Sequence, residues 1–200
     1  MKKFLIAIMI LFFTLPALAE NTILIVGDSL SAGYGIDPAT GWVMLLKQRL
    51  KDLKYNYQVV NASISGDTLS NGLSRLPDAL TKYKPNITII ELGANDALRG
   101  LSPELIKKNL DSLILLATKS GSKVLVLGVR LPPNYGEVYS NEFQRVFQKI
   151  KSTHDIKVVP LFLKNVDDKP KLMQADGLHP VTEAQIILLN NVWPALKELL

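Results

Sequence analysis

Short apolar runs alternate with longer amphipathic stretches along most of the chain. The run at residues 22–26, Thr-Ile-Leu-Ile-Val, does not alternate between polar and apolar positions, which is typical of a strand buried on both faces. We predict strands at residues 22–26, 57–61, 87–92, 124–129 and 157–163.

Between these runs, apolar residues recur at helical spacing. Leu69, Leu73, Leu76 and Leu80 fall on one stripe, and Thr68 in front of them can cap the helix. The predicted helices lie at residues 42–53, after Thr68, from Ser102 to about Gly121, after the cap Ser140, and at residues 182–200.

The regular alternation of strands and helices predicts an α/β fold. Five such units imply a parallel sheet covered by helices on both faces, and right-handed crossovers favour a flavodoxin-like three-layer α/β/α sandwich. No internal repeat or linker marks a boundary. We therefore expect a single domain over residues 20–200, of a size that suits one hydrophobic core.

Residues 1–19 have the pattern of a secretory signal peptide. Residues 1–3 are Met-Lys-Lys, an apolar run follows, and residues 17–19 give an Ala-Leu-Ala cleavage site before Glu20. The alternative is a membrane anchor, but a spanning helix needs about 20 apolar residues, and this run is shorter and ends at Pro16. We expect an exported protein, periplasmic or secreted, with no stable membrane anchor after cleavage.

Composition and charge narrow the chemistry. The chain has no cysteine, which excludes disulfides, cysteine-ligated zinc and a thiol nucleophile. A net charge of +5 without a Lys/Arg run does not indicate nucleic-acid binding. Phosphate-loop, complete dinucleotide and H-E-x-x-H motifs are absent. We expect a monomer that uses no cofactor, metal or nucleic acid.

Polar residues follow four of the predicted strands. In parallel sheets ligands bind beyond the carboxyl ends of the strands, so these segments should meet at one edge. They are residues 27–31 (Gly-Asp-Ser-Leu-Ser), 61–67, 93–96 (Gly-Ala-Asn-Asp) and, after a loop, 176–180 (Asp-Gly-Leu-His-Pro).

This edge offers each group that acyl transfer by serine requires: a hydroxyl, a base, an orienting acid and oxyanion donors. Of the two histidines, His154 is expected on the solvated last turn of a helix, which makes His179 the better base. Asp176 can reach its far ring nitrogen, and Ser29 is the candidate nucleophile.

Each residue also has an ordinary structural role open to it. Ser29 can cap a helix, Asp176 can close an Asp-Gly turn, Asn95 can satisfy backbone groups, and Gly66 can serve a turn. Alternatively, the Asn95 amide and the backbone N–H groups of Gly66 and Ser29 form an oxyanion hole.

The joint set resembles the sequence blocks of the GDSL or SGNH hydrolase family, in the family's order and over essentially the whole mature chain. The matching residues are Gly27-Asp28-Ser29-Leu30, Gly66, Gly93-x-Asn95-Asp96 and Asp176-x-x-His179. The resemblance implies Ser29 as nucleophile, His179 as base and Asp176 as its orienting acid. It also implies oxyanion donors from Ser29, Gly66 and Asn95. Ala94 departs from close relatives, which often carry glycine there.

The expected function is hydrolysis of fatty-acyl esters and thioesters, such as lysophospholipid, acyl-CoA and aryl esters, through an acyl-enzyme. Leu98, Leu101, Leu131 and Tyr135 are candidates to line an acyl groove, although ordinary loop packing also accounts for such residues. Two alternatives stay open: a carbohydrate acetyl esterase of the same fold, and a non-catalytic periplasmic module that binds a small ligand.

Overall fold

The computed structural model describes residues 21–200, so the predicted signal peptide lies outside the described residues. The strands form one parallel sheet in the order β2-β1-β3-β4-β5. They are β1 (Asn21–Gly27), β2 (Tyr57–Asn61), β3 (Ile87–Glu91), β4 (Lys123–Leu127) and β5 (Lys157–Val159).

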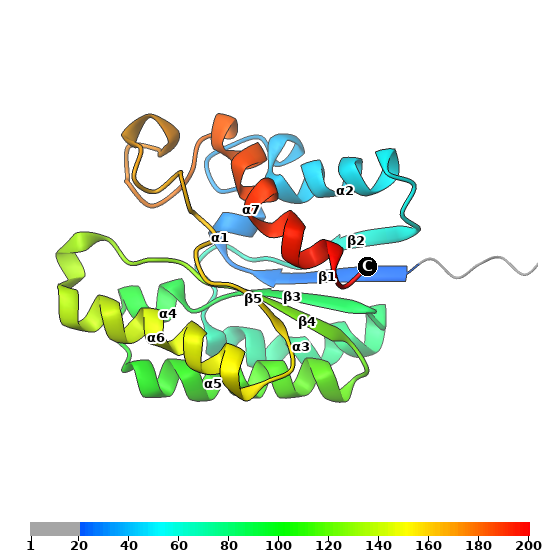
Figure 1. The fold of residues 1–200 in the computed structure, drawn as a ribbon, viewed down its shortest axis with the longest axis horizontal. Coiled ribbons are helices and arrows are strands. Elements are labelled where there is room, and N and C mark those ends of the chain that lie inside the picture. Colours follow the sequence, from blue (N-terminus) through cyan, green and yellow to red (C-terminus); the bar gives the residue numbers. More distant parts are fainter. Residues whose placement is uncertain (1–20) are drawn as a thin grey trace, which may run out of the picture.

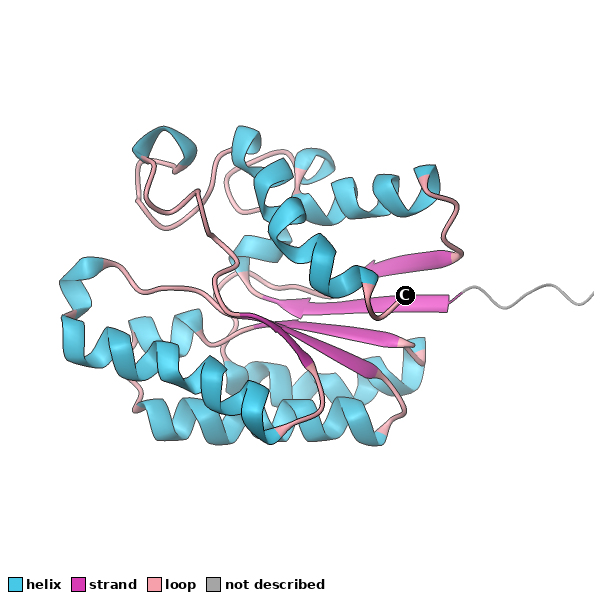
Figure 2. Cartoon of the chain, in the orientation of Figure 1, coloured by secondary structure: helices cyan, strands magenta, loops and turns pink. Residues whose placement is uncertain are grey.

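Helices cover both faces of this sheet, which confirms the predicted α/β/α architecture (Figure 1). Helices α2 and α7 lie on one face, and α3, α4, α5 and α6 lie on the other (Figures 1 and 2). The α-helices are α1 (Ser29–Ala32), α2 (Trp42–Asp52), α3 (Leu69–Tyr83), α4 (Ala94–Leu98), α5 (Pro103–Lys119), α6 (Glu137–Thr153) and α7 (Gln185–Lys197).

The hydrophobic core lies between the sheet and its two helix layers. Residues 22–27 of β1 and all of β3 are buried, as expected of central strands of a parallel sheet. Each buried leucine or isoleucine contributes about 1.5–3 kcal/mol relative to an exposed one. Two fully packed central strands therefore carry the loops after β1 and β3.

Several predicted boundaries are wrong, among them the ends of the strands predicted at residues 87–92 and 124–129, which stop at Glu91 and Leu127, and the end of the last helix, which stops at Lys197. Helix α6 begins at Glu137 after Gly136, and Ser140 lies inside its first turn, where its N–H donates to the Gly136 carbonyl. Strand β5 ends at Val159 because Pro160 has no N–H for the ladder. Residues 182–184 form a 3₁₀ turn before α7.

Candidate active site

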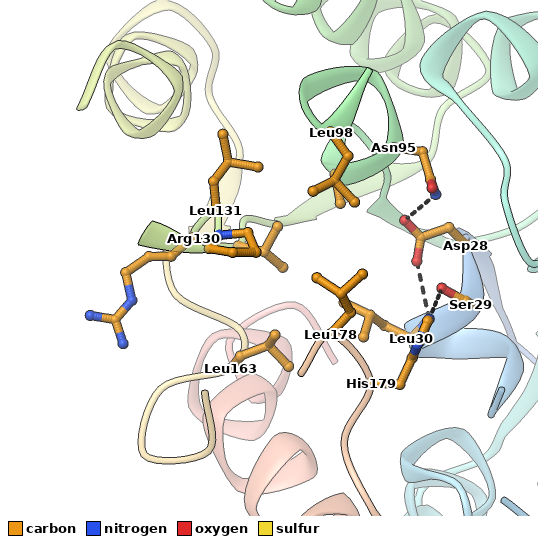
Figure 3. Close-up of a pocket in the computed structure, with 13 residues that line it drawn as sticks. Asp28, Ser29, Leu30, Asn95, Leu98, Arg130, Leu131, Leu163, Leu178 and His179 are labelled. Carbon is orange, nitrogen blue, oxygen red and sulfur yellow. Dashed lines mark hydrogen bonds between the residues drawn. The ribbon is translucent and has the colours of Figure 1, made fainter. Parts of the chain in front are cut away.

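The segments that follow β1, β2, β3 and β5 meet at the carboxyl edge of the sheet. Ser29 is the first residue of α1, directly after β1, and Asn95 lies in α4, directly after β3. Gly66 lies in the loop after β2, and Asp176 and His179 lie in the long segment between β5 and α7. Figure 3 shows Ser29, His179 and Asn95 approaching one another from these separate elements.

A chain of hydrogen bonds joins Asp176, His179 and Ser29. His179 Nδ1 lies 2.6 Å from Asp176 Oδ2, and His179 Nε2 lies 2.8 Å from Ser29 Oγ. A carboxylate can only accept, so Nδ1–H donates to Asp176, and Nε2 is left to accept the Ser29 hydroxyl hydrogen. This is the arrangement that activates a serine hydroxyl.

Asp176 makes the contacts that belong to both of the roles that the sequence left open. Its Oδ1 accepts the N–H groups of Leu178 and His179 at 2.9 and 3.0 Å, which closes the turn, while Oδ2 holds the imidazole. Burial raises the pKa of Asp176, but the bonds from the His179 ring and the two amides outweigh it and lower the pKa to about 2. The carboxylate therefore stays ionised at neutral and mildly acidic pH.

The helix-capping role considered for Ser29 belongs to its neighbour. Asp28 caps α1, and its Oδ1 accepts the Leu30 N–H at 3.0 Å. The Ser29 hydroxyl is thereby left to His179. The Asp28 side chain is buried, and burial raises its pKa to about 6 despite the bond from the Leu30 amide.

The Asn95 amide nitrogen is engaged by protein acceptors. Its Nδ2 donates to Asp28 Oδ2 at 3.1 Å and to the Asp67 carbonyl at 3.0 Å. By contrast, the N–H groups of Ser29 and Gly66 donate to no acceptor within residues 21–200. Gly66 has φ +83°, which favours glycine, and the space beside its Cα is open.

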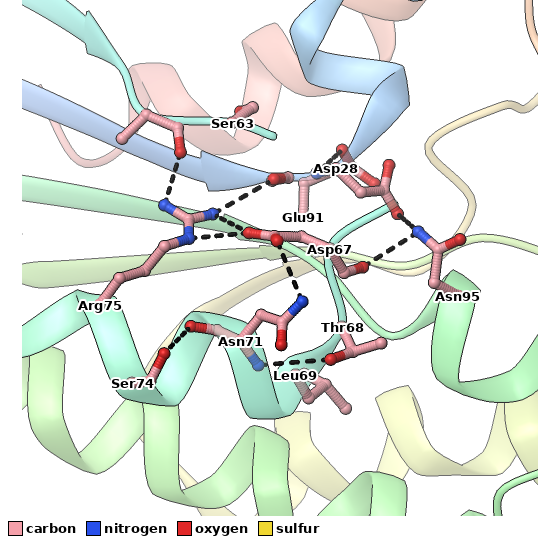
Figure 4. A network of polar contacts seen from close by, with 12 residues as sticks. Asp28, Ser63, Asp67, Thr68, Leu69, Asn71, Ser74, Arg75, Glu91 and Asn95 are labelled. Carbon is pink, nitrogen blue, oxygen red and sulfur yellow. Dashed lines mark hydrogen bonds and ion pairs between the residues drawn. The ribbon is translucent and has the colours of Figure 1, made fainter. Parts of the chain in front are cut away.

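Arg75 braces the loops that carry these groups. Its Nε donates to Asp67 Oδ2 at 2.7 Å, while its other nitrogens reach the carbonyls of Ala62 and Gly27 (Figure 4). One guanidinium on α3 therefore ties together the ends of β1 and β2 and the Asp67 loop. The pair is partly buried, so solvent screens it less than an exposed pair.

Besides Asp28, the carboxyl group of Glu91 is also buried close to the segment that carries Ser29. Glu91, at the end of β3, accepts the Ser31 hydroxyl at 2.8 Å and the Asp28 N–H at 3.4 Å. Burial, and then the nearby Asp28 charge, raise the pKa of Glu91 well above its usual range. Sequence reasoning gave no role to Asp28 or Glu91, although an acid at the end of an apolar run was a visible signal.

An apolar cavity of about 100 Å³ opens beside Ser29 and His179 (Figure 3). Of the four residues predicted for an acyl groove, Leu98 and Leu131 line this cavity, whereas Leu101 and Tyr135 do not. Leu101 packs against the core, and the Tyr135 hydroxyl bonds to the Leu98 carbonyl. Sequence reasoning missed the remaining apolar lining, which comes from Leu30, Ala94, Val129, Pro132, Leu163 and Leu178.

A second hollow of about 390 Å³ adjoins this cavity. The two share Leu131, Leu163 and Leu178 in their walls, and Met173 lines the far part. Arg130, also shared, is held by Asp167 in a two-pronged ion pair with bonds of 2.6 and 2.9 Å. Together the hollows form a groove beside Ser29, whose lining includes apolar side chains and, in the second hollow, the charged residues Arg130, Asp167 and Asp168.

His154 is not the solvated residue that the sequence suggested. Its side chain is only 14% exposed, and its Nε2 lies 2.8 Å from Asp111 Oδ1, which links the end of α6 to α5. It therefore has a structural partner far along the chain, and His179 remains the histidine that contacts Ser29.

Within residues 21–200, no cluster of three or more histidines and acids is arranged to hold a metal ion. The same part of the chain contains no helix that is long and apolar enough to cross a membrane.

The model of the GDSL-like lipase/acylhydrolase family matches residues 25–185. The chain belongs to this family. Esterase TesA of Pseudomonas aeruginosa is 51% identical to this GDSL hydrolase, over 91% of this chain and 90% of its own. Thioesterase 1/protease 1/lysophospholipase L1 of Escherichia coli (strain K12) is 40% identical, over 86% of this chain and 81% of its own.

The crystal structure of TesA has the same fold as this GDSL hydrolase. The two superpose with a TM-score of 0.88 at 51% sequence identity, covering 90% of this chain and 100% of the other. Family membership makes the protein an acyl hydrolase, and the resemblance drawn from the sequence blocks is confirmed. The non-catalytic binding module is thereby set aside.

Proposed function

We propose that this protein hydrolyses fatty-acyl esters and thioesters, with Ser29 as nucleophile, His179 as general base and Asp176 as the acid that orients it. The observation that carries the proposal is the hydrogen-bonded chain from Asp176 through His179 to Ser29, beside an apolar cavity. The names of its relatives, an esterase and a thioesterase/lysophospholipase, agree with this assignment.

In the proposed reaction, Ser29 Oγ attacks the acyl carbonyl while His179 Nε2 takes the hydroxyl proton. The tetrahedral intermediate collapses when the histidine returns this proton to the leaving alcohol or thiol, and the acyl group stays on Ser29. Water, deprotonated by the same histidine, then releases the fatty acid. The ionised Asp176 stabilises the imidazolium in both halves of the cycle.

We propose that the oxyanion of the tetrahedral intermediate is stabilised by hydrogen bonds from the N–H groups of Ser29 and Gly66 and from the Asn95 amide. The two backbone groups have no protein acceptor within the described residues, so each can donate fully. Asn95 is held by Asp28 and Asp67, and one of these bonds must weaken as Nδ2 turns to the oxyanion.

The shape and lining of the groove favour long acyl chains over acetyl groups. Its apolar side chains can desolvate successive methylenes, each worth roughly 0.8 kcal/mol. An acetyl group would leave most of this surface unused. The carbohydrate acetyl esterase is therefore the weaker alternative.

Ser29→Ala tests the nucleophile. We expect this variant to lose p-nitrophenyl ester hydrolysis and labelling by a fluorophosphonate probe, while its thermal unfolding stays unchanged. Ser74→Ala, at an exposed serine on α3, is the matched control and should keep both activities. Turnover by folded Ser29→Ala at the wild-type rate would refute the assignment.

Leu131→Ala tests the groove. Because Leu131 lines both hollows, we expect kcat/KM for a decanoyl ester to fall about tenfold, corresponding to roughly 1.4 kcal/mol of lost apolar contact, with little change for the acetyl ester. The comparison uses p-nitrophenyl esters of increasing chain length, beside acyl-CoA, lysophospholipid and an acetylated sugar. A wild-type preference for acetyl esters alone would overturn the fatty-acyl assignment.

We also propose that residues 1–19 direct export and are removed, and that the natural substrate is met outside the cytoplasm. N-terminal sequencing of the exported protein should begin at Glu20. Recovery of the full-length chain in the cytoplasmic fraction would contradict this.

A further inference from the structure

Gln174 lies two residues before Asp176 and closes the loop that holds the acid and the base. Its N–H donates to the His179 carbonyl at 2.7 Å, and its own carbonyl accepts the Gly177 N–H at 3.0 Å. Its side-chain Nε2 donates to the Pro180 carbonyl at 3.1 Å. These bonds fasten the start of the loop to its end, beside the antiparallel bridge between Met173 and Pro180.

The same side chain reaches the segment that carries Ser29. Gln174 Nε2 also donates to the Tyr34 carbonyl at 2.8 Å. The Tyr34 N–H in turn donates to the Ser29 carbonyl at 3.1 Å. A continuous path of hydrogen bonds therefore joins the histidine loop to the backbone of Ser29, separately from the bond between the two side chains.

Two further features of the Tyr34 segment fit this link. The Tyr34 ring packs on the His179 imidazole, with centroids 4.5 Å apart and planes tilted by 40°. Gly35 has φ +73°, and a Cβ there would collide with the Gln174 side-chain amide. The segment thus leaves room for the amide on one side and supports the imidazole on the other.

We propose that Gln174 is a positioning residue that sets the separation between His179 Nε2 and Ser29 Oγ, acting through the Tyr34 carbonyl. The proposal rests on the proposed function, because it concerns the activation of Ser29 by His179. Gln174 does not line the cavity, so its effect falls on the rate of acylation and not on substrate binding.

Gln174→Leu removes both donor hydrogens while keeping a side chain of similar size. We expect kcat for a p-nitrophenyl ester to fall roughly ten- to a hundredfold, with KM within about twofold, since a displacement on the order of 1 Å can cost about a hundredfold in rate. The rate constant for fluorophosphonate labelling of Ser29 should fall by the same factor. A merely structural loss would instead lower the fraction of protein that labels and leave the rate constant of the folded fraction unchanged.

Gln58→Leu is the matched control. Gln58 is an exposed glutamine on β2 whose Nε2 also donates one hydrogen bond, to Thr22 Oγ1 at 2.9 Å, far from the site. It should keep wild-type kcat. Gln174→Glu is the second variant: it preserves the length of the side chain, and at neutral pH its carboxylate cannot donate to either carbonyl, so we expect the same loss of kcat.

Wild-type kcat and labelling rate in either folded Gln174 variant would overturn the proposal. So would a rise in KM at constant kcat, because that result would place Gln174 in substrate binding. If Ser29→Ala is inactive while the Gln174 variants are fully active, only the positioning role fails. If Ser29→Ala is active, the proposed function itself fails.

Discussion

At the scale of single residues, Asp28 connects three parts of the site, although no role was assigned to it from the sequence. Its carboxylate caps the helix that begins with Ser29 and also holds the Asn95 amide. Its backbone N–H reaches Glu91. The residue before the proposed nucleophile therefore helps to set the direction in which the proposed oxyanion donor points.

Asp28→Asn should lower kcat with little change in KM. If the new side-chain oxygen keeps the Leu30 N–H, the new NH₂ group faces the NH₂ group of Asn95, and one of the two amides must turn. We expect a loss of about 10- to 100-fold, below the roughly 10²- to 10³-fold cost of deleting an oxyanion donor. Steady-state kinetics on p-nitrophenyl esters measure it.

Asp37→Asn is the control for this variant. Asp37 caps a 3₁₀ turn by accepting the Ala39 N–H at 2.9 Å, so it shares the capping geometry of Asp28 without contacting Asn95. It should retain full activity. Equal kcat in Asp28→Asn and the wild type would show that Asp28 does not govern the Asn95 amide.

At the scale of elements, the pattern of apolar residues predicted every strand of the sheet. It did so because positions buried in strands and on one side of helices are apolar. The first residues of β2 and β3 and the Thr68 cap of α3 were all predicted correctly. Element ends were less predictable. Ser140 has a capping side chain, but the N-cap of α6 is Gly136, with φ +81°, and the helix begins before Ser140 is reached.

The polar residues of the candidate site could be predicted from the sequence, but the apolar residues that line its cavity could be predicted only in part. Ser29 and Asn95 closely follow strands, so sheet topology places them at one edge, whereas His179 was found through the Asp176-x-x-His179 motif. Leu101 and Tyr135 sit on loops of the same region, yet the direction of a loop side chain depends on tertiary packing. For this reason Leu163 and Leu178 were missed.

Gly128→Ala should destabilise the contact between β4 and α6. A Cβ at Gly128 would lie 2.8 Å from Cγ of the buried Phe147 ring, which cannot bend away. We expect a loss of about 1–3 kcal/mol in the free energy of unfolding, as for other overpacked cores. Chemical denaturation measures it.

The double variant Gly128→Ala/Phe147→Leu provides the control. Because the smaller side chain relieves the contact, the double variant should lose less stability than the sum of the two single variants. Strict additivity would mean that the Phe147 ring is not what opposes a side chain at position 128.

At the scale of the whole molecule, two buried carboxyl groups give the folded state a higher affinity for protons than the unfolded state has. The pKa of Asp28 is raised to about 6, and that of Glu91 is raised well above its usual range. Stability from these groups is therefore fully present below their unfolded pKa values, near 4, and is lost as the pH rises through the folded values. Asp176, with a pKa of about 2, acts oppositely: its contribution is lost as the pH falls from about 4 toward 2.

Glu91→Gln should flatten the alkaline side of this profile. The amide oxygen can still accept from Ser31 and from the Asp28 N–H, but the group no longer ionises. We expect the stability of the variant relative to the wild type to increase as the pH rises above about 4, the usual pKa of a carboxyl group. Urea denaturation across this range measures the difference, and a difference independent of pH would contradict the prediction.

The antiparallel bridge between Met173 and Pro180 has one more consequence for the molecule as a whole. It closes the loop on itself, so Asp176 and His179 are held in one hydrogen-bonded turn, while Ser29 begins α1 directly after β1. The acid–base pair and the serine therefore lie on separate elements, joined by the bond between Nε2 and Oγ and by the path through Gln174 and Tyr34. A change in the reactivity of the serine should therefore leave the spectroscopic signals of the imidazole–carboxylate pair constant. The two quantities can be measured on the same sample.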